Sequence, residues 1–167
     1  MESISAEVLK TAFLGTNYDP LQKLEELSQV NTISPKMRSV GAFLVIKYMQ
    51  ENEQGNIFNL MSGYRSFFLG FKDVSDRDRN RIKYYVGKCT LPDNLQQQIL
   101  IFRTLERARI FPDEEFRASI RTRIIDGIQA LKDPAERISL CESILLTLDD
   151  SRQQLHKIAD RYEEAPS

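Results

Sequence analysis

Five of the six prolines stand where an α-helix could begin, and they constrain the fold more than any other feature of this chain. Proline loses nothing in the first turn of a helix by lacking an N–H, and its ring fixes φ near the helical value. A preceding Asp, Ser or Thr can accept hydrogen bonds from the free amides of that turn. Each of these sites therefore predicts a helix start, and the sites are Asp19-Pro20, Ser34-Pro35, Thr90-Leu91-Pro92, Phe111-Pro112-Asp113 and Asp133-Pro134.

Apolar residues follow the start signals at helical spacing. After Pro112, for example, a stripe with spacings of 4, 4, 4 and 3 runs through Phe116, Ile120, Ile124, Ile128 and Leu131. Sustained alternation of period two, the mark of a half-buried strand, does not occur. We therefore predict an all-α fold, a compact bundle of eight or nine helices in which antiparallel hairpins could stack like a short solenoid. The expected helices cover residues 4–14, 20–30, 35–52, 56–70, 75–88, 91–110, 112–131, 134–149 and 151–163.

The linkers between these helices are short, and no low-complexity segment divides the chain. We expect a single helical domain over residues 1–163 and a disordered tail over 164–167. The helices over 35–52 and 56–70 are apolar on most sides, which is typical of the centre of a bundle. An exposed groove for the amphipathic helix of a partner is the alternative for the Phe-rich second segment. Three glycines inside helices are expected to allow close helix approach, namely Gly41, Gly63 and Gly127.

Charge is unevenly distributed along the chain. Residues 57–111 carry 10 basic and 5 acidic side chains, a net charge of +5, whereas residues 1–56 carry −2 and residues 112–167 carry −4. A basic middle region can mark an anionic partner, or it can attract the acidic parts of the same fold. The whole-chain pI of 5.9 argues against a dedicated nucleic-acid binder, whose domain pI usually exceeds about 9.

The basic middle region contains one helix with a charged stripe. If residues 75–88 are helical, Arg77, Arg81, Tyr85 and Lys88 share one side, and we expect this stripe to face solvent. The apolar side of the same helix is expected to face the core through Ile82, Val86 and Cys89. The stripe predicts contact with an acidic protein surface, with Tyr84 or Tyr85 as an aromatic anchor. The alternative is single-stranded nucleic acid such as RNA, with phosphates on the basic groups and a base stacked on a tyrosine.

A second group of arginines lies near the start of the helix expected over 112–131. Arg117 and Arg121 flank the apolar pair Phe116 and Ile120. Arginine favours planar, bidentate recognition of carboxylates, so this placement suits an ion pair at the edge of a helix–helix or subunit contact. We predict Arg117 and Arg121 as further partner-binding residues.

Catalytic motifs are not found in this sequence. It holds one histidine and has no Gly-rich phosphate loop, no GxSxG, no CxxC and no HExxH. His156, Asp160 and Glu163 share a helical side, but such a set near a chain end is more typical of a solvated face than of a metal site. We therefore expect no enzyme activity, no cofactor, no metal and no small-molecule substrate.

The surroundings of the chain are predicted from three features. The longest apolar run, Val40 to Ile46, is far shorter than the roughly 20 residues of a membrane-spanning helix. The start MESISAEVLK lacks a basic region before an apolar stretch, so we expect no secretory signal. Cys89 and Cys141 fall on apolar stripes, as expected of buried thiols in the reducing cytoplasm. Together these features predict a non-enzymatic interaction protein, such as an adaptor, a regulator or an assembly subunit, that binds a protein partner or another copy of itself.

Overall fold

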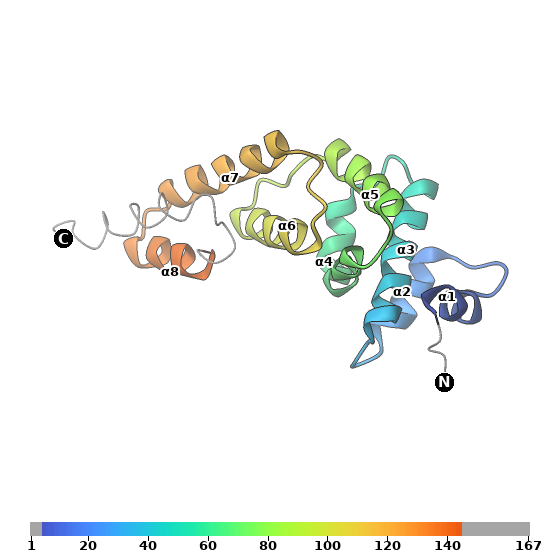
Figure 1. Ribbon diagram of the computed structural model, residues 1–167. Coiled ribbons are helices and arrows are strands. Elements are labelled where there is room, and N and C mark those ends of the chain that lie inside the picture. The colour runs from blue at the N-terminus through green and yellow to red at the C-terminus, as the bar shows by residue number, and fades with distance from the viewer. Residues whose placement is uncertain (1–4, 145–167) are drawn as a thin grey trace. The chain divides into compact units, whose positions relative to one another are not determined.

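The computed structural model describes residues 5–144, without the side chains of Ala6 and Ser143. These residues form eight α-helices and one 3₁₀ helix, and no strand occurs among them, which confirms the all-α prediction. The helices are α1 (Ala6–Leu14), α2 (Pro20–Ser28), α3 (Pro35–Glu51), α4 (Ile57–Phe68), α5 (Asp76–Lys88), α6 (Leu95–Ala108), α7 (Glu114–Gln129) and α8 (Pro134–Ile144), with the 3₁₀ helix η1 (Leu69–Lys72) after α4 (Figure 1). The expected helix over 151–163 and the expected tail lie outside the described residues.

Proline start signals mark the beginning of three helices. As predicted, α2, α3 and α8 begin at Pro20, Pro35 and Pro134. The residue before each proline caps the helix; before α3, for example, the hydroxyl of Ser34 accepts a hydrogen bond from the N–H of Met37 at 3.3 Å. Proline and cap therefore act together at these starts.

The start predicted at residue 91 is wrong, because α6 begins at Leu95. Asn94 is the effective cap, since its side-chain oxygen accepts a hydrogen bond from the N–H of Gln97 at 3.0 Å. The carbonyl of Pro92 instead accepts a hydrogen bond from the side-chain amide of Gln98 at 2.8 Å. The proline thus belongs to the turn that leads into the helix.

The described chain divides into two compact units. One contains the residues up to Thr90 together with Thr104–Pro112, and the other contains Leu91–Arg103 and the residues from Asp113 onward. Helix α6 contributes to both units. The single domain expected over residues 1–163 stays a prediction.

In the first unit α3 is the central helix and packs against α1, α2, α4, η1 and α5 (Figure 1). Its buried side chains point in several directions, from Val40 and Leu44 to Met49, as an apolar helix inside a bundle requires. The aromatic segment after it is also interior, because Phe67 and Phe68 are at most 1% exposed. These rings form core, and the alternative of an exposed groove is wrong for them.

Two glycines allow close packing in this unit. A Cβ at Gly41 would come within 2.6 Å of the ring of Phe67. A Cβ at Gly70 would overlap the backbone carbonyl of Arg38, so here η1 lies directly against the backbone of α3. The expectation for Gly63 is wrong, because nothing lies within 4 Å of a Cβ built there.

The second unit contains the first part of α6 together with α7 and α8. Helix α7 begins at Glu114, two residues later than predicted, because Asp113 rather than Pro112 is its N-cap. The apolar stripe of α7 is buried at its centre, where Ile120, Ile124 and Ile128 are fully covered. The expectation for Gly127 is confirmed, because a Cβ there would lie 2.8 Å from the side chain of Leu95.

Candidate interaction face on α5

Helix α5 begins at a serine cap and has a charge pattern that fits its dipole. The hydroxyl of Ser75 accepts a hydrogen bond from the N–H of Asp78 at 3.2 Å. Asp76 and Asp78 lie in the first turn and Lys88 in the last, so both ends carry the charge that opposes the helix dipole. The sequence therefore fixes this helix locally before any packing is considered.

One side of α5 packs into the first unit through Ile82 and Val86, which are fully buried as predicted. Tyr85 joins them at 9% exposure, so the expectation that this ring faces solvent is wrong. Tyr85 lies three residues after Ile82 and next to Val86, which turns it toward their side of the helix. Its aromatic area then favours burial over exposure.

The opposite side of α5 is open and carries Arg77, Arg81, Tyr84 and Lys88, at spacings of 4, 3 and 4. We call these four residues the α5 basic face. Arg77 is exposed and makes no ion pair or hydrogen bond within residues 5–144. Arg81 reaches Asp78 only at 3.9 Å, with 40% of its side chain exposed. The predicted basic stripe is therefore present, with Tyr84 in the place expected for Tyr85.

Tyr84 is 59% exposed, which is unusual for a large aromatic ring. The ammonium of Lys88 lies 4.5 Å from its ring centre, and the ring of Tyr85 meets it edge-on at 5.5 Å between centres. The interaction with Tyr84 is the main reason that the pKa of Lys88 is raised. Both contacts hold the exposed ring in place on the surface.

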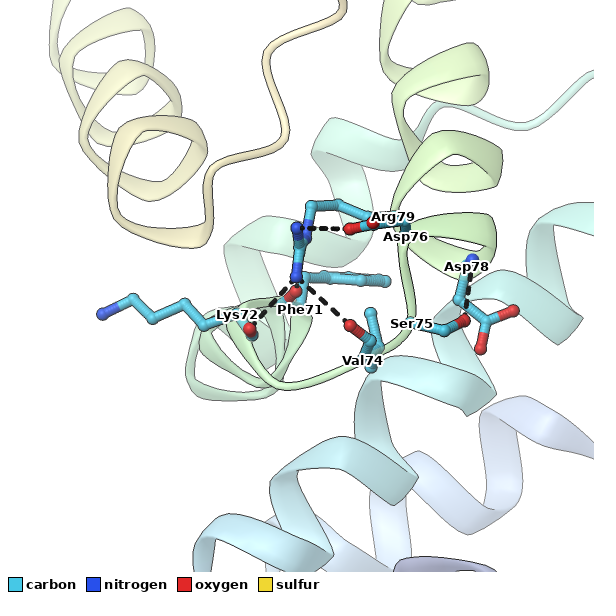
Figure 2. Close-up of polar contacts among 7 residues, drawn as sticks. All are labelled: Phe71, Lys72, Val74, Ser75, Asp76, Asp78 and Arg79. Carbon is cyan, nitrogen blue, oxygen red and sulfur yellow. Dashed lines mark hydrogen bonds and ion pairs between the residues drawn. The ribbon is translucent and has the colours of Figure 1, made fainter.

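Arg79 lies on α5 but does not belong to the α5 basic face. Its guanidinium donates to three backbone carbonyls between η1 and α5, those of Phe71 at 3.1 Å, Lys72 at 3.1 Å and Val74 at 3.2 Å. It also pairs with Asp76 at 3.2 Å, and Figure 2 shows the whole arrangement. Carbonyls at the end of a helix lack helical partners, and Arg79 supplies donors for them. Sequence reasoning missed this role, although Arg79 lies two residues away from the stripe of Arg77.

Arg117 is buried within the second unit, with 8% of its side chain exposed. Its guanidinium lies 5.4 Å from the ring centre of Phe102 and 3.5 Å from a carboxylate oxygen of Glu114. The ion pair that we predicted next to a helix–helix contact is thus formed, but inside the unit. Burial is incompatible with Arg117 as a partner contact, whereas Arg121 is half-buried.

A pocket of about 420 Å³ opens beside the end of α5 and includes Glu53, Lys88 and Cys89 in its lining. The sulfur of Cys89 accepts a hydrogen bond from the N–H of Ile57 at 3.3 Å, and the thiol lies 3.2 Å from the carbonyl of Tyr85. Burial raises the pKa of this thiol, which favours the neutral form. The arrangement suits a structural thiol between α4 and α5 better than a nucleophile.

Burial also raises the pKa of the Cys141 thiol in α8. No group of three or more His, Cys, Asp or Glu side chains arranged for a metal ion occurs within residues 5–144. His156, Asp160 and Glu163, the set considered for metal binding, lie outside that range. In the same part of the chain, no helix combines the length and the apolar character needed to cross a membrane.

No protein-family model, curated protein or solved structure matches this chain. The functional argument therefore depends on the geometry of the α5 basic face itself.

Proposed function

We propose that this chain is a non-enzymatic protein-interaction protein, and that the α5 basic face binds an acidic surface on a protein partner. The observation that carries the proposal is the exposure of Tyr84 between basic groups. Tyrosine and arginine are enriched among the residues that dominate binding energy at protein interfaces. Exposed Arg77 and Arg81 supply charge on the same side of the helix.

Preorganisation of Tyr84 supports the same proposal. Lys88 and Tyr85 already restrict its ring, so a partner need not order a free side chain on binding. The helix below it is fixed by Ile82 and Val86 in the core. A rigid helical body that presents one aromatic anchor among cations is suited to an adaptor, a regulator or an assembly subunit. The two free cysteines fit a place in the reducing cytoplasm.

Single-stranded nucleic acid is less well supported as the partner. A base must stack on an open aromatic ring, and the Lys88 ammonium already lies over the ring of Tyr84. The acidic side chains of Asp73 and Asp76 are exposed close to the start of the face, where they would repel phosphates. An acidic protein surface meets fewer of these obstacles, because it can pair with the cations without requiring stacking.

The test is a pull-down from the native source with and without nuclease. The variant Arg77→Glu with Arg81→Glu should lose the partner while keeping its helicity by circular dichroism. The matched control is Arg107→Glu with Lys132→Glu, which makes the same change in net charge at two other exposed residues. Retention of the partner by the first variant contradicts the proposal. Loss of the partner on nuclease treatment supports nucleic acid instead.

A further inference from the structure

Helix α5 and the residues just before it carry opposite charges at their two ends. Asp73 and Asp76 are exposed at the start, and the side chain of Asp76 is 92% exposed. The exposed cation Lys88 stands in the last turn. A surface with acids at one end and a cation at the other is complementary to a second copy of itself in the reverse orientation.

We propose that two copies of this chain pair through the α5 basic face, with their α5 helices antiparallel about a two-fold axis. This inference rests on the proposed function, because it names a second copy of the chain as the acidic partner. An axis that crosses between Asn80 and Arg81 places residues equally far from it along the helix opposite each other. Arg77 then faces Tyr84 of the second copy, and Lys88 faces the segment before α5, where Asp73 is exposed.

The contacts in this arrangement are chemically matched. Arg77 has no ion pair or hydrogen bond within residues 5–144, so its guanidinium is available to stack on the exposed ring of Tyr84 in the second copy. Each contact occurs twice because the pairing is symmetric. Antiparallel helices also bring opposite ends of the helix dipoles together. Parallel pairing would instead place Lys88 against Lys88 and Arg77 against Arg77.

The dimer should be weak and sensitive to salt. One helical face is small compared with the roughly 1,200–2,000 Å² buried in stable interfaces. Its charges are exposed, so ions screen them over a Debye length of about 10 Å at moderate salt. Self-association should therefore appear at high protein concentration and low salt, and it should weaken as salt is added.

Sedimentation velocity over a concentration series at low salt tests the proposal. We expect Lys88→Glu to weaken dimerisation roughly tenfold, since two symmetric attractions become repulsions. Adding Asp73→Lys to Lys88→Glu should restore it, because the charges are then exchanged. Arg107→Glu is the control for net charge and should leave dimerisation unchanged. Failure of the double variant to recover would overturn the proposed pairing.

Oxidative cross-linking tests the orientation independently. Asn80→Cys lies next to the axis and should form a disulfide-linked dimer, whereas Lys88→Cys should not. The unaltered chain, treated in the same way, shows the background from Cys89 and Cys141. A cross-linked dimer of Lys88→Cys alone supports parallel pairing and contradicts the inference.

The two proposals can fail separately. If the native chain stays monomeric while Arg77→Glu with Arg81→Glu still loses a protein partner, the self-pairing is wrong and the proposed function stands. If the chain is monomeric and that variant keeps every partner, both are wrong.

Discussion

The side chain of Arg79 donates a hydrogen bond from Nε to the backbone carbonyl of Phe71 at 3.1 Å, which ties α5 to the end of η1. Arg79→Gln should lower the free energy of unfolding by about 1–3 kcal/mol, because carbonyls that it satisfies would lose a charged donor. Arg79→Lys should recover only part of the loss, since an ammonium cannot match the planar fork. Urea unfolding measures the effect. The control Arg77→Gln should stay within about 0.5 kcal/mol of the native chain, because Arg77 is exposed.

Tyr84 and Tyr85 are adjacent in sequence and should differ in the effect of truncation. Tyr85→Ala should lower the free energy of unfolding by roughly 3 kcal/mol, because the ring is buried. Tyr84→Ala should change it by less than about 0.5 kcal/mol but weaken partner binding. Thermal unfolding and the pull-down together measure both effects. Equal losses of stability in the two variants would show that the two rings are not divided between core and surface.

Two glycine-to-alanine substitutions should have opposite effects on stability. Gly70→Ala should destabilise by about 1–3 kcal/mol, because its Cβ would overlap the backbone of Arg38 and force α3 and η1 apart. Gly63→Ala should stabilise by about 0.5–1 kcal/mol, since open space surrounds its Cβ and alanine is a better helix former. Urea unfolding of both variants checks the prediction, and a stable Gly70→Ala would contradict the close backbone contact.

Arg109 occupies a left-handed backbone conformation, with φ of 59°, just after α6. The N–H of Ile110 bonds to the carbonyl of Leu105 at 3.1 Å, which closes the end of the helix in the way that usually requires glycine. Arg109→Gly should therefore stabilise the fold by about 0.5–1 kcal/mol. Arg109→Ala is the control, because it removes the charge and keeps the strain, so its unfolding free energy should not rise. Equal gains in both variants would assign the effect to charge.

Tyr64 should show a pH effect at alkaline pH. Its hydroxyl donates to a carboxylate oxygen of Glu25 at 2.6 Å, and this hydrogen bond is the main reason that its pKa is raised to about 12. Because the folded pKa lies above the ordinary value of 10.0, the stabilisation is complete below about pH 10 and is lost between pH 10 and 12. At neutral pH Tyr64→Phe should cost roughly 0.5 kcal/mol, the low end for a hydrogen bond, since the contact is open to solvent.

Ultraviolet titration of the tyrosines provides the measurement. The native chain should show a tyrosine that ionises late, and Tyr64→Phe should remove it. Glu25→Gln removes the carboxylate and should bring the late ionisation back toward the ordinary range. An unchanged titration curve in both variants would contradict the contact.

The fold could be predicted from local signals wherever those signals agreed with one another. Pro20 and Pro35 each follow a capping side chain, and the helices begin there. At Pro92 the pattern contained a second cap, Asn94, and sequence spacing alone could not decide which cap the helix would use. Loop side chains such as Gln98, which binds the carbonyl of Pro92, decided it through contacts that no periodicity encodes.

The candidate site could be predicted only as far as the side of the helix. Spacing placed Arg77, Arg81 and Lys88 together, and it left Tyr84 and Tyr85 as alternative anchors. The choice between them depends on which residues of neighbouring helices lie beside each ring. The same holds for Arg117, since its burial depends on the ring of Phe102, which belongs to a different helix. Contacts between elements, rather than periodicity, settle which charged side chains remain exposed.

The backbone contact at Gly70 also determines how a distant relative of this chain could be recognised. Buried Phe, Leu and Ile can replace one another when volume is conserved, so most of the interior can diverge over evolution. Position 70 has no such freedom, because any side chain would collide with the main chain of α3 at Arg38. An invariant glycine there, following an aromatic-rich segment, should persist in homologous sequences after most other similarity has disappeared.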